Sequence, residues 1–276
     1  MNAKEFYYKC VDELSFTEDA KFEALCMFET LLNINKTSLI SKDLVIGNDD
    51  IKIINQAISR RKKSEPLQYI LGGWDFYDMS FFVGDGVLIP RPETEMLVDF
   101  ALEKIKDIES PVIYDLCAGT GCIGLTIANH RKDAKVYLFE KEEKALNYLV
   151  KNKEKYKLDN ATIIQCDIFD YDFSSLPLCD ILLSNPPYIE TAEIKSLQNE
   201  VLFEPISALD GGTDGLNFYR IIYDKWLPKV KKNGFVAFEC GEEQSQPICD
   251  IFKSKTTSSK VLFDFNDIDR IVTFGI

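Results

Sequence analysis

The chain has 276 residues, 46% of them hydrophobic and 28% charged, a composition typical of a globular protein with one large and one small domain. Its net charge of −13 at pH 7 disfavours non-specific binding to DNA or RNA, which requires a basic surface to neutralise phosphates. No apolar run approaches the roughly 20 residues that a membrane span needs, and the first residues lack a secretory signal pattern. We therefore expect a cytoplasmic protein without membrane contact.

Cysteine and histidine contents limit the chemistry further. Eight cysteines are scattered without a Cys-x-x-Cys pair, which predicts buried, reduced thiols and no metal site. The single histidine, His130, lies near the end of a predicted helix. One histidine disfavours a Ser-His-Asp triad, so we expect His130 to cap the helix or to face solvent.

Residues 1–73 show helical periodicity. Apolar side chains between Phe22 and Leu32 recur at helical spacing, and Thr17 followed by Asp19 and Ala20 indicates the start of that helix. A second helix is expected over residues 49–61. It ends in the basic run 60–63, whose charge suits a solvated helix C-terminus; contact with an acidic partner or RNA is the alternative.

Residues 74–90 predict a hairpin of two short strands, 74–83 and 84–89, that links two domains. Beyond it, helical and strand patterns alternate, which indicates a parallel sheet covered on both faces. The chain then ends in a predicted antiparallel hairpin. We expect an α/β domain over residues 91–276, with a Rossmann-like, mostly parallel sheet closed by that hairpin. The predicted strands are 112–116, 135–140, 162–165, 180–184, 234–239, 260–265 and 270–274.

A glycine-rich loop follows the first of these strands. Gly119-x-Gly121-x-x-Gly124 leads into an apolar helix, and such glycines allow the backbone to approach NAD or S-adenosylmethionine (SAM) closely. Glu140 ends the next strand, about twenty residues on, where a carboxylate accepts hydrogen bonds from the ribose hydroxyls of either ligand. A glycine-rich turn without a ligand is the alternative.

Two aspartates extend this predicted cofactor site. Asp167 follows the third strand and is expected to bond the adenine amino group while Ile168 packs on the adenine ring. A helix N-cap is the alternative role for Asp167. Asp115 is expected to orient the glycine loop or to reach the methionine end of SAM.

The most informative stretch is Asn185-Pro186-Pro187-Tyr188, directly after the buried strand 180–184. Proline fixes φ and has no N–H, so the turn is rigid and rich in carbonyl acceptors. A side-chain amide, these carbonyls and an aromatic ring suit the NH2 of a planar amino group, such as a base amine or a glutamine amide. An ordinary Pro-Pro turn is the alternative. With the closing hairpin and no candidate for hydride transfer, the tetrapeptide favours SAM over NAD.

With these motifs the chain resembles, over nearly its whole length, the HemK/PrmC family, the protein-(glutamine) methyltransferases of class-I peptide chain release factors. Leu88-Ile89-Pro90-Arg91-Pro92-Glu93-Thr94-Glu95 is the most diagnostic segment. The other matching segments are 60–61, 64–72, 185–189, 203–205, 210–212, 214–215 and 239–241 with Gln244.

The resemblance implies a small N-terminal helical bundle, a candidate for docking the release factor, and a SAM-dependent domain that methylates the glutamine of the Gly-Gly-Gln loop. S-adenosylhomocysteine would be the product. Asn185 would touch both ligands, and its side-chain oxygen and the Pro186 carbonyl would accept the two N–H bonds of the substrate amide. Tyr188 would pack on the amide face. The residues expected to contact SAM are Cys117, Ala118, Gly119, Thr120, Gly121, Glu140 and Ile168; Asn185, Pro186, Pro187 and Tyr188 are expected to hold the glutamine.

Two residues depart from the family pattern: Cys117-Ala118 replaces a commoner pair, and Ile168 stands where an aromatic residue can lie. Four alternatives remain at this point: an adenine-amino DNA methyltransferase, a glutamine methyltransferase of a ribosomal protein, a SAM- or nucleotide-binding module, and a dehydrogenase. The acidic charge disfavours DNA. We expect a monomer whose partners are class-I release factors. Glu93 and Glu95 are weaker site candidates than the residues above, because helix N-terminal carboxylates commonly complement the dipole.

Overall fold

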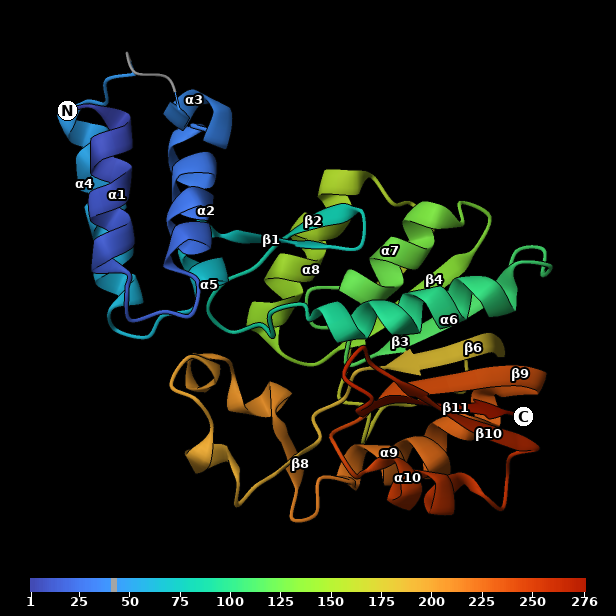
Figure 1. Cartoon of the computed structure of the whole chain (residues 1–276). Coiled ribbons are helices and arrows are strands. Elements are labelled where there is room, and N and C mark those ends of the chain that lie inside the picture. The colour runs from blue at the N-terminus through green and yellow to red at the C-terminus, as the bar shows by residue number, and fades with distance from the viewer. Residues whose placement is uncertain (41–43) are drawn as a thin grey trace. The chain divides into compact units, whose positions relative to one another are not determined.

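The computed structural model describes residues 1–40 and 44–276; residues 41–43, inside the predicted helical region, lie outside the described part. The chain divides into two compact units (Figure 1). The first comprises Met1–Gly73 with Asn199–Phe203, and the second comprises Trp74–Gln198 with Glu204–Ile276. The sequence did not predict that residues 199–203 belong with the N-terminal helices.

The first unit is helical, as predicted. Asp19 accepts a hydrogen bond from the Phe22 N–H at 3.0 Å and so caps the second helix at its predicted start. Phe28 and Met27 are fully buried and form the core with apolar residues of the other helices. The helices are α1 (Ala3–Glu13), α2 (Ala20–Leu32), α3 (Lys36–Ile40), α4 (Asn48–Arg61) and α5 (Leu67–Leu71).

Three residues at the basic end of α4, Arg60, Lys62 and Lys63, are exposed as expected, and Arg61 is the exception. The side chain of Arg61 is only 5% exposed and donates to Glu23 at 2.7 and 3.0 Å and to Glu200 at 2.6 Å. Arg60 pairs with Glu65 at 2.5 Å. Because Arg61 binds both Glu23 and Glu200, it anchors residues 199–203 to the helices of the first unit.

The second unit contains a seven-stranded sheet with the order β10-β11-β9-β6-β3-β4-β5. Five strands are parallel, and β11 runs antiparallel to both β9 and β10, which confirms the predicted fold class. The strands are β3 (Val112–Leu116), β4 (Lys135–Glu140), β5 (Ala161–Gln165), β6 (Cys179–Ser184), β9 (Val230–Glu239), β10 (Ser258–Phe263) and β11 (Asp269–Gly275).

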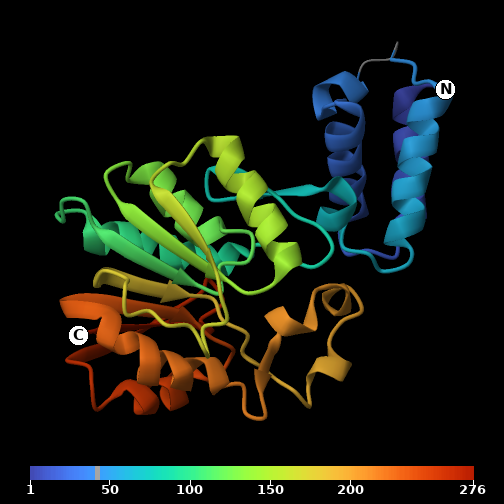
Figure 2. The same ribbon diagram turned by 180° about the vertical axis from the view of Figure 1, so that it is seen from behind.

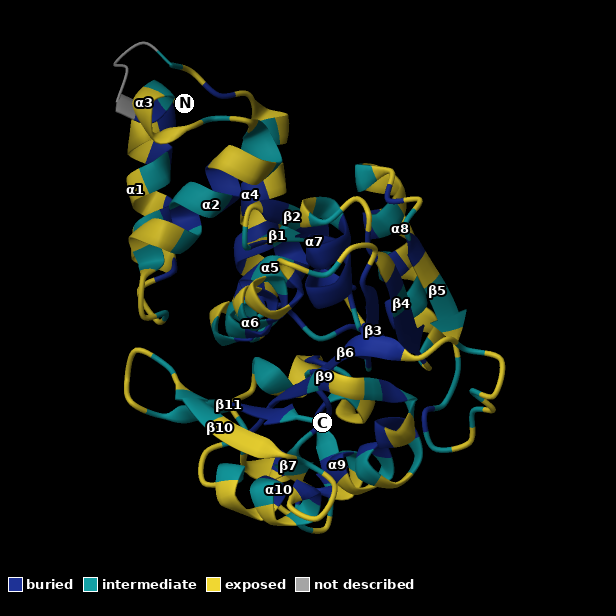
Figure 3. Ribbon diagram, turned by 90° about the vertical axis from the view of Figure 1, so that its right-hand side faces the viewer, coloured by how far each residue is buried: buried dark blue, intermediate teal, exposed yellow. Residues whose placement is uncertain are grey.

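Side-chain alternation along the strands builds one core on each face of the sheet. Ile113 and Leu183 pack with one group of helices, whereas Tyr114 and Leu182 pack with the other. Helices form one layer on each face of the sheet, and Figures 1 and 2 show these two layers from the front and from behind. Strands β3 and β6 lie between the layers and are buried (Figure 3). The first layer holds α6 (Glu95–Ile105), α7 (Cys122–His130) and α8 (Glu143–Tyr156); the second holds α9 (Asn217–Ile221) and α10 (Ser245–Phe252).

The predicted hairpin lies earlier than expected. Its strands are β1 (Gly73–Phe76) and β2 (Met79–Phe82), whereas residues 84–89 contain turns and no strand, because Gly86 adopts a φ of 92° and Pro90 ends the segment. Phe76 and Phe81 belong to the core beneath α6, α7 and α8. The hairpin is therefore an integral part of the second unit.

The helical pattern expected between β5 and β6 is absent. Residues 166–178 form turns and irregular backbone, since aspartate side chains accept from nearby main-chain N–H groups, as Asp172 does from Ser174 at 2.9 Å. Phe169, Tyr171 and Phe173 of this segment pack into the second core, where Tyr171 stacks on Trp226 at an interplanar angle of 8°.

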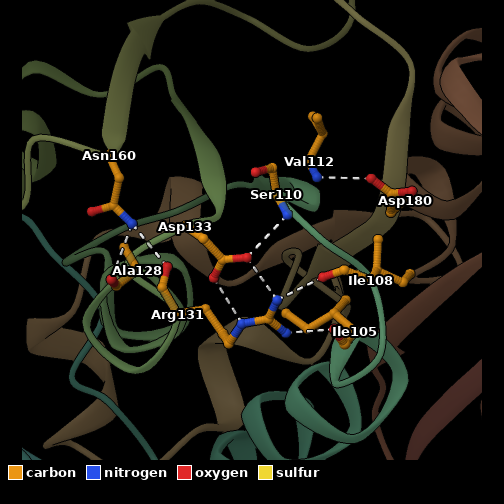
Figure 4. Close-up of polar contacts among 9 residues, drawn as sticks. All are labelled: Ile105, Ile108, Ser110, Val112, Ala128, Arg131, Asp133, Asn160 and Asp180. Carbon is orange, nitrogen blue, oxygen red and sulfur yellow. Dashed lines mark hydrogen bonds and ion pairs between the residues drawn. The ribbon is translucent and has the colours of Figure 1, made fainter.

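A network of charged and amide side chains ties the helices to the N-terminal edge of the sheet (Figure 4). Arg131, directly after α7, donates to the main-chain carbonyls of Ile105 and Ile108 and pairs with Asp133 at 2.9 Å. Ile105 is the last residue of α6, where a cation complements the helix dipole, and Ile108 lies in the turn that follows the helix. The other contacts drawn join Asn160 to Ala128 and Arg131, Ser110 to Asp133, and Val112 to Asp180.

Replacing Arg131 should destabilise the second unit. Arg131→Ala leaves the carbonyls of Ile105 and Ile108 and the carboxylate of Asp133 without their charged donor, and we expect a loss of about 2–4 kcal/mol in the free energy of unfolding. Urea unfolding followed by circular dichroism measures it. Lys132→Ala is the matched control, because Lys132 is an exposed neighbour, and should change stability by less than about 0.5 kcal/mol. Equal effects of the two substitutions would contradict the structural role of Arg131.

Candidate active site

A cavity of about 470 Å³ lies at the C-terminal ends of β3, β4 and β6. This edge is where ligands of open α/β sheets bind, and the volume suits a cofactor. Strand register builds the site: Leu116 pairs with Phe139, so Cys117 and Glu140 leave the sheet side by side. Ser184 pairs with Phe238 in the same way, which brings Asn185 beside Glu239.

The three glycines of the loop have different tasks. A Cβ on Gly119, at a φ of 56°, would meet nothing closer than Val87 at 3.9 Å, so the backbone there is open to a ligand. A Cβ on Gly121, at a φ of 81°, would lie 2.2 Å from Leu149. On Gly124 it would lie 2.8 Å from Leu138, so Gly121 and Gly124 permit close packing of the loop and helix α7.

Glu140 holds the loop through main-chain hydrogen bonds. Its Oε2 accepts from the Gly119 N–H at 2.8 Å, and its Oε1 accepts from Lys141 and Glu142, each at 2.8 Å. A carboxylate offers about four acceptor positions, so one remains for a ligand. The expected contact of Glu140 with the ribose hydroxyls stays a prediction. Burial raises the pKa of Glu140, and the three main-chain donors oppose that effect.

Asp115 lies beneath the loop and does not line the cavity. Its Oδ2 accepts from the Gly124 N–H at 2.9 Å, near the start of α7, which matches the expected loop-orienting role. Oδ1 is buried and has no hydrogen-bond partner among the described residues. Burial raises the pKa of Asp115 to about 7.

The rest of the loop is held by the main chain. Ala118 N–H donates to the Phe139 carbonyl at 3.0 Å, and the Thr120 carbonyl accepts from the buried Asn152 amide at 3.0 Å. Cys117 has a φ of 59°, a left-handed conformation that costs a non-glycine residue about 1–2 kcal/mol. Burial raises the pKa of its thiol well above the ordinary range, which disfavours the thiolate form.

Asp167 and Ile168 both line the cavity. No helix follows Asp167, so its alternative role as a helix N-cap is wrong; its Oδ1 instead accepts from the Phe169 N–H at 3.0 Å within a turn. Lys141 pairs with Oδ2 at 2.9 Å. Ile168 is buried and presents its side chain as an apolar wall.

The tetrapeptide Asn185–Tyr188 is only partly exposed to the cavity. Asn185 and Pro187 line it, whereas Pro186 and Tyr188 do not. The Asn185 Nδ2 donates to Thr94 Oγ1 at 3.2 Å, and the Tyr188 hydroxyl donates to Glu239 Oε1 at 3.3 Å. The predicted contacts of Pro186 and Tyr188 with a substrate therefore stay predictions.

Distant segments fix the backbone of the tetrapeptide. Gln244 Nε2 donates to the Tyr188 carbonyl at 2.8 Å. A Cβ on Gly211 would lie 2.7 Å from the Tyr188 Cα, and one on Gly215 would lie 2.3 Å from the Tyr188 oxygen. Parallel pairing of β7 (Ile189–Glu190) with β8 (Asp210–Gly212) completes the support. Gly211 and Gly215 are therefore required by close packing against the tetrapeptide, whereas a Cβ on Gly212 would meet the Asn217 side chain.

Thr94 and Glu239 are site residues that the sequence analysis did not identify as such. Both are buried, and the Thr94 hydroxyl donates to Glu239 Oε2 at 2.5 Å. Burial raises the pKa of Glu239 to about 7. Their signals were present: Thr94 belongs to the diagnostic segment 88–95, and Glu239 ends a strand next to the one that precedes Asn185.

An ion pair joins two walls of the cavity. Glu204 is buried, pairs with Arg91 and accepts from the Ile89 N–H at 3.0 Å. Residues 86–91 and 205–208 line the cavity on either side of this pair. Glu95, by contrast, accepts from the Tyr77 N–H at 2.7 Å and anchors the hairpin turn.

Comparison with known proteins agrees with this geometry. A family described as methyltransferase small domain matches residues 94–212, and the PrmC N-terminal domain matches residues 9–72. The release factor glutamine methyltransferase of Thermodesulfovibrio yellowstonii is 36% identical over 276 residues, 99% of this chain and 97% of that protein. That of Bacillus subtilis is 33% identical over 262 residues, 92% of this chain and 90% of that protein.

Among solved structures, the hMettl16 catalytic domain in complex with the MAT2A 3′UTR hairpin 1 has a TM-score of 0.59, with 13% identity, over 92% of this chain and 89% of that chain. At this identity the likeness supports the fold alone. Sheet, glycine loop and Asn-Pro-Pro-Tyr turn define a methyltransferase with a Rossmann-like domain. Full-length similarity to curated relatives is more specific: the chain belongs to the release factor glutamine methyltransferase family.

Gly215→Ala should damage the site through the Tyr188 carbonyl. The new Cβ would lie 2.3 Å from that oxygen and must displace the tetrapeptide, so we expect methyl transfer to fall about 100-fold, the effect of a misplacement near 1 Å. Gly72→Ala is the matched control, with a similar φ of 75° and nothing within 4 Å of the Cβ. It should cost about 1–2 kcal/mol of stability at most and leave the rate unchanged. Similar rates for both variants would contradict this packing role.

Asp115 should make stability depend on pH. Its pKa rises from 3.8 to about 7 on folding, so the folded state binds more protons than the unfolded state between these values. The free energy of unfolding therefore falls as pH rises from about 4 to 7, by up to a few kcal/mol. We expect a shallower fall for Asp115→Asn in urea titrations between pH 5 and 8. Asp159→Asn, at an exposed position, should follow the wild type, and an unchanged slope for Asp115→Asn would refute the assignment.

Proposed function

We propose that this protein transfers a methyl group from SAM to the side-chain amide nitrogen of the glutamine in the Gly-Gly-Gln motif of class-I peptide chain release factors, in translation termination. The observation that carries the proposal is the position of the Asn185 side chain. It lines the cavity next to the glycine loop, and its Nδ2 donates a hydrogen bond to Thr94 Oγ1. Full-length similarity to proteins named release factor glutamine methyltransferase supports the choice of substrate.

The cavity fits SAM by its own features. Gly119 offers open backbone, Glu140 retains one acceptor position, and Ile168 supplies an apolar wall. We propose that these residues hold the cofactor, with Asp167 at the adenine amino group and Asn185 near the methyl. Bound SAM supplies an electrophilic methyl group on a positively charged sulfur. Asp115 contributes indirectly, through the loop that it orients.

The chain's own task is to position a weak nucleophile. An amide nitrogen is weakly nucleophilic because its lone pair is delocalised into the carbonyl. In our proposal Asn185 Oδ1 and the Pro186 carbonyl accept the two N–H bonds of the substrate amide, which holds its nitrogen toward the methyl and stabilises positive charge on it. Well-oriented groups contribute roughly 7–11 kcal/mol to catalysis. No strong base is required, because a methylated, positively charged amide nitrogen loses its proton readily to water.

Charge supports a protein substrate over DNA, since a net charge of −13 repels polyphosphate. No helix among the described residues is long and apolar enough to cross a membrane. The cytoplasmic location and the monomeric state expected from the sequence stay predictions.

Transfer of labelled methyl from SAM to a purified class-I release factor tests the proposal. We expect label on the wild-type factor and none on its Gly-Gly-Gln glutamine-to-alanine variant or on duplex DNA. With Asn185→Ala the rate should fall by about two to three orders of magnitude, the usual effect of removing one transition-state hydrogen bond. Calorimetry should show SAM affinity close to that of the wild type.

Each departure has a distinct meaning. Label on DNA, or on the substituted factor as strongly as on the wild-type factor, would refute the proposed substrate. Equal loss of SAM affinity and turnover in Asn185→Ala would refute the assignment of Asn185 to the substrate amide.

A further inference from the structure

We propose that Thr94 and Glu239 are positioning residues that fix which end of the Asn185 side-chain amide faces the substrate. The inference rests on the proposed function and extends it to a hydrogen-bond chain, Glu239–Thr94–Asn185, whose two hydrogen bonds measure 2.5 and 3.2 Å.

The direction of the chain follows from counting protons. The Thr94 hydroxyl has a single hydrogen, and it donates this hydrogen to Glu239 Oε2. Its oxygen can then only accept, so the atom of Asn185 that faces Thr94 must be the NH2 nitrogen. The Asn185 oxygen is therefore the end left for the cavity, where the proposed mechanism needs an acceptor. The reversed amide would present NH2 to the NH2 of the substrate.

Burial makes this preference strong. Thr94 is 1% exposed and Glu239 is 3% exposed, so bulk water does not compete for either group. Glu239 also accepts from the Tyr188 hydroxyl with its other oxygen, and its main-chain carbonyl accepts from Tyr219 at 2.7 Å. One carboxylate thus holds the side chains at both ends of the tetrapeptide.

The charge of Glu239 controls the direction. Thr94 and Tyr188 donate to it, Glu93 repels its negative charge and Arg270 attracts it, while desolvation raises its pKa to about 7. Below that pH the protonated carboxyl can donate to Thr94. The Thr94 hydroxyl is then free to donate to the Asn185 oxygen, which reverses the amide. We therefore expect kcat to fall as pH drops through about 7.

Two substitutions at Thr94 separate positioning from packing. Thr94→Val keeps the shape and removes the hydroxyl, so we expect kcat to fall about tenfold or more, with the Kd for SAM within twofold of wild type. Thr94→Ser restores the hydroxyl and should recover most of the rate. In an Asn185→Ala background, Thr94→Val should cost less than twofold, because a residue that acts through Asn185 has no independent effect. Glu239→Gln should remove the acidic limb of the pH profile.

The measurement is the initial rate of labelled-methyl transfer to a class-I release factor between pH 5.5 and 8.5. Wild-type rates for Thr94→Val, or equal losses for the valine and serine variants, would overturn the inference while the proposed function stands. A full tenfold loss in the Asn185→Ala background, or an acidic limb that persists in Glu239→Gln, would also overturn it. Absence of transfer by the wild-type protein would refute the proposed function, and this inference with it.

Discussion

Buried carboxylates on parallel strands are the constraint on which the site depends. Asp115 is in β3, Glu140 ends β4 and Glu239 ends β9, and each accepts hydrogen bonds from the segment that it positions. Asp115 and Glu140 hold the glycine loop, and Glu239 holds Thr94 and Tyr188. Parallel strands bring their C-terminal ends to one edge, so three separate carboxylates organise one cavity.

This arrangement opposes the stability of the fold. Removing a carboxylate from water is costly, and burial raises the pKa of all three groups. Glu140 offsets part of the cost with three main-chain donors, whereas Asp115 leaves one oxygen without a partner among the described residues. The left-handed backbone conformation of Cys117 adds to the free-energy cost of the site. Such local costs are typical of sites where geometry matters more than stability.

Local patterns predicted the sheet well because its strands are continuous apolar runs, and β3 and β4 have the predicted bounds. They failed where tertiary contacts decide the structure. Residues 166–178 contain no helix because aspartates bond the main chain in turns and because Tyr171 and Phe173 pack on Trp226. Arg61 is buried because Glu23 and Glu200 bind it. Thr94 and Glu239 are 145 residues apart in sequence, so no local pattern relates them.

A fixed acceptor on Asn185 also explains how such a site would select an amide. In the proposed geometry two rigid acceptors, the Asn185 oxygen and the Pro186 carbonyl, match the two hydrogens of a planar NH2 group. A hydroxyl has one hydrogen and would leave one acceptor unpaired, at a cost of about 1–3 kcal/mol. An ionised carboxylate has no hydrogen and would leave both acceptors unpaired. A site built to hydrogen-bond a group rejects analogues that lack this group far more strongly than an apolar pocket does. In this proposal the buried Thr94 and Glu239 orient Asn185 and so contribute to specificity as well as to rate.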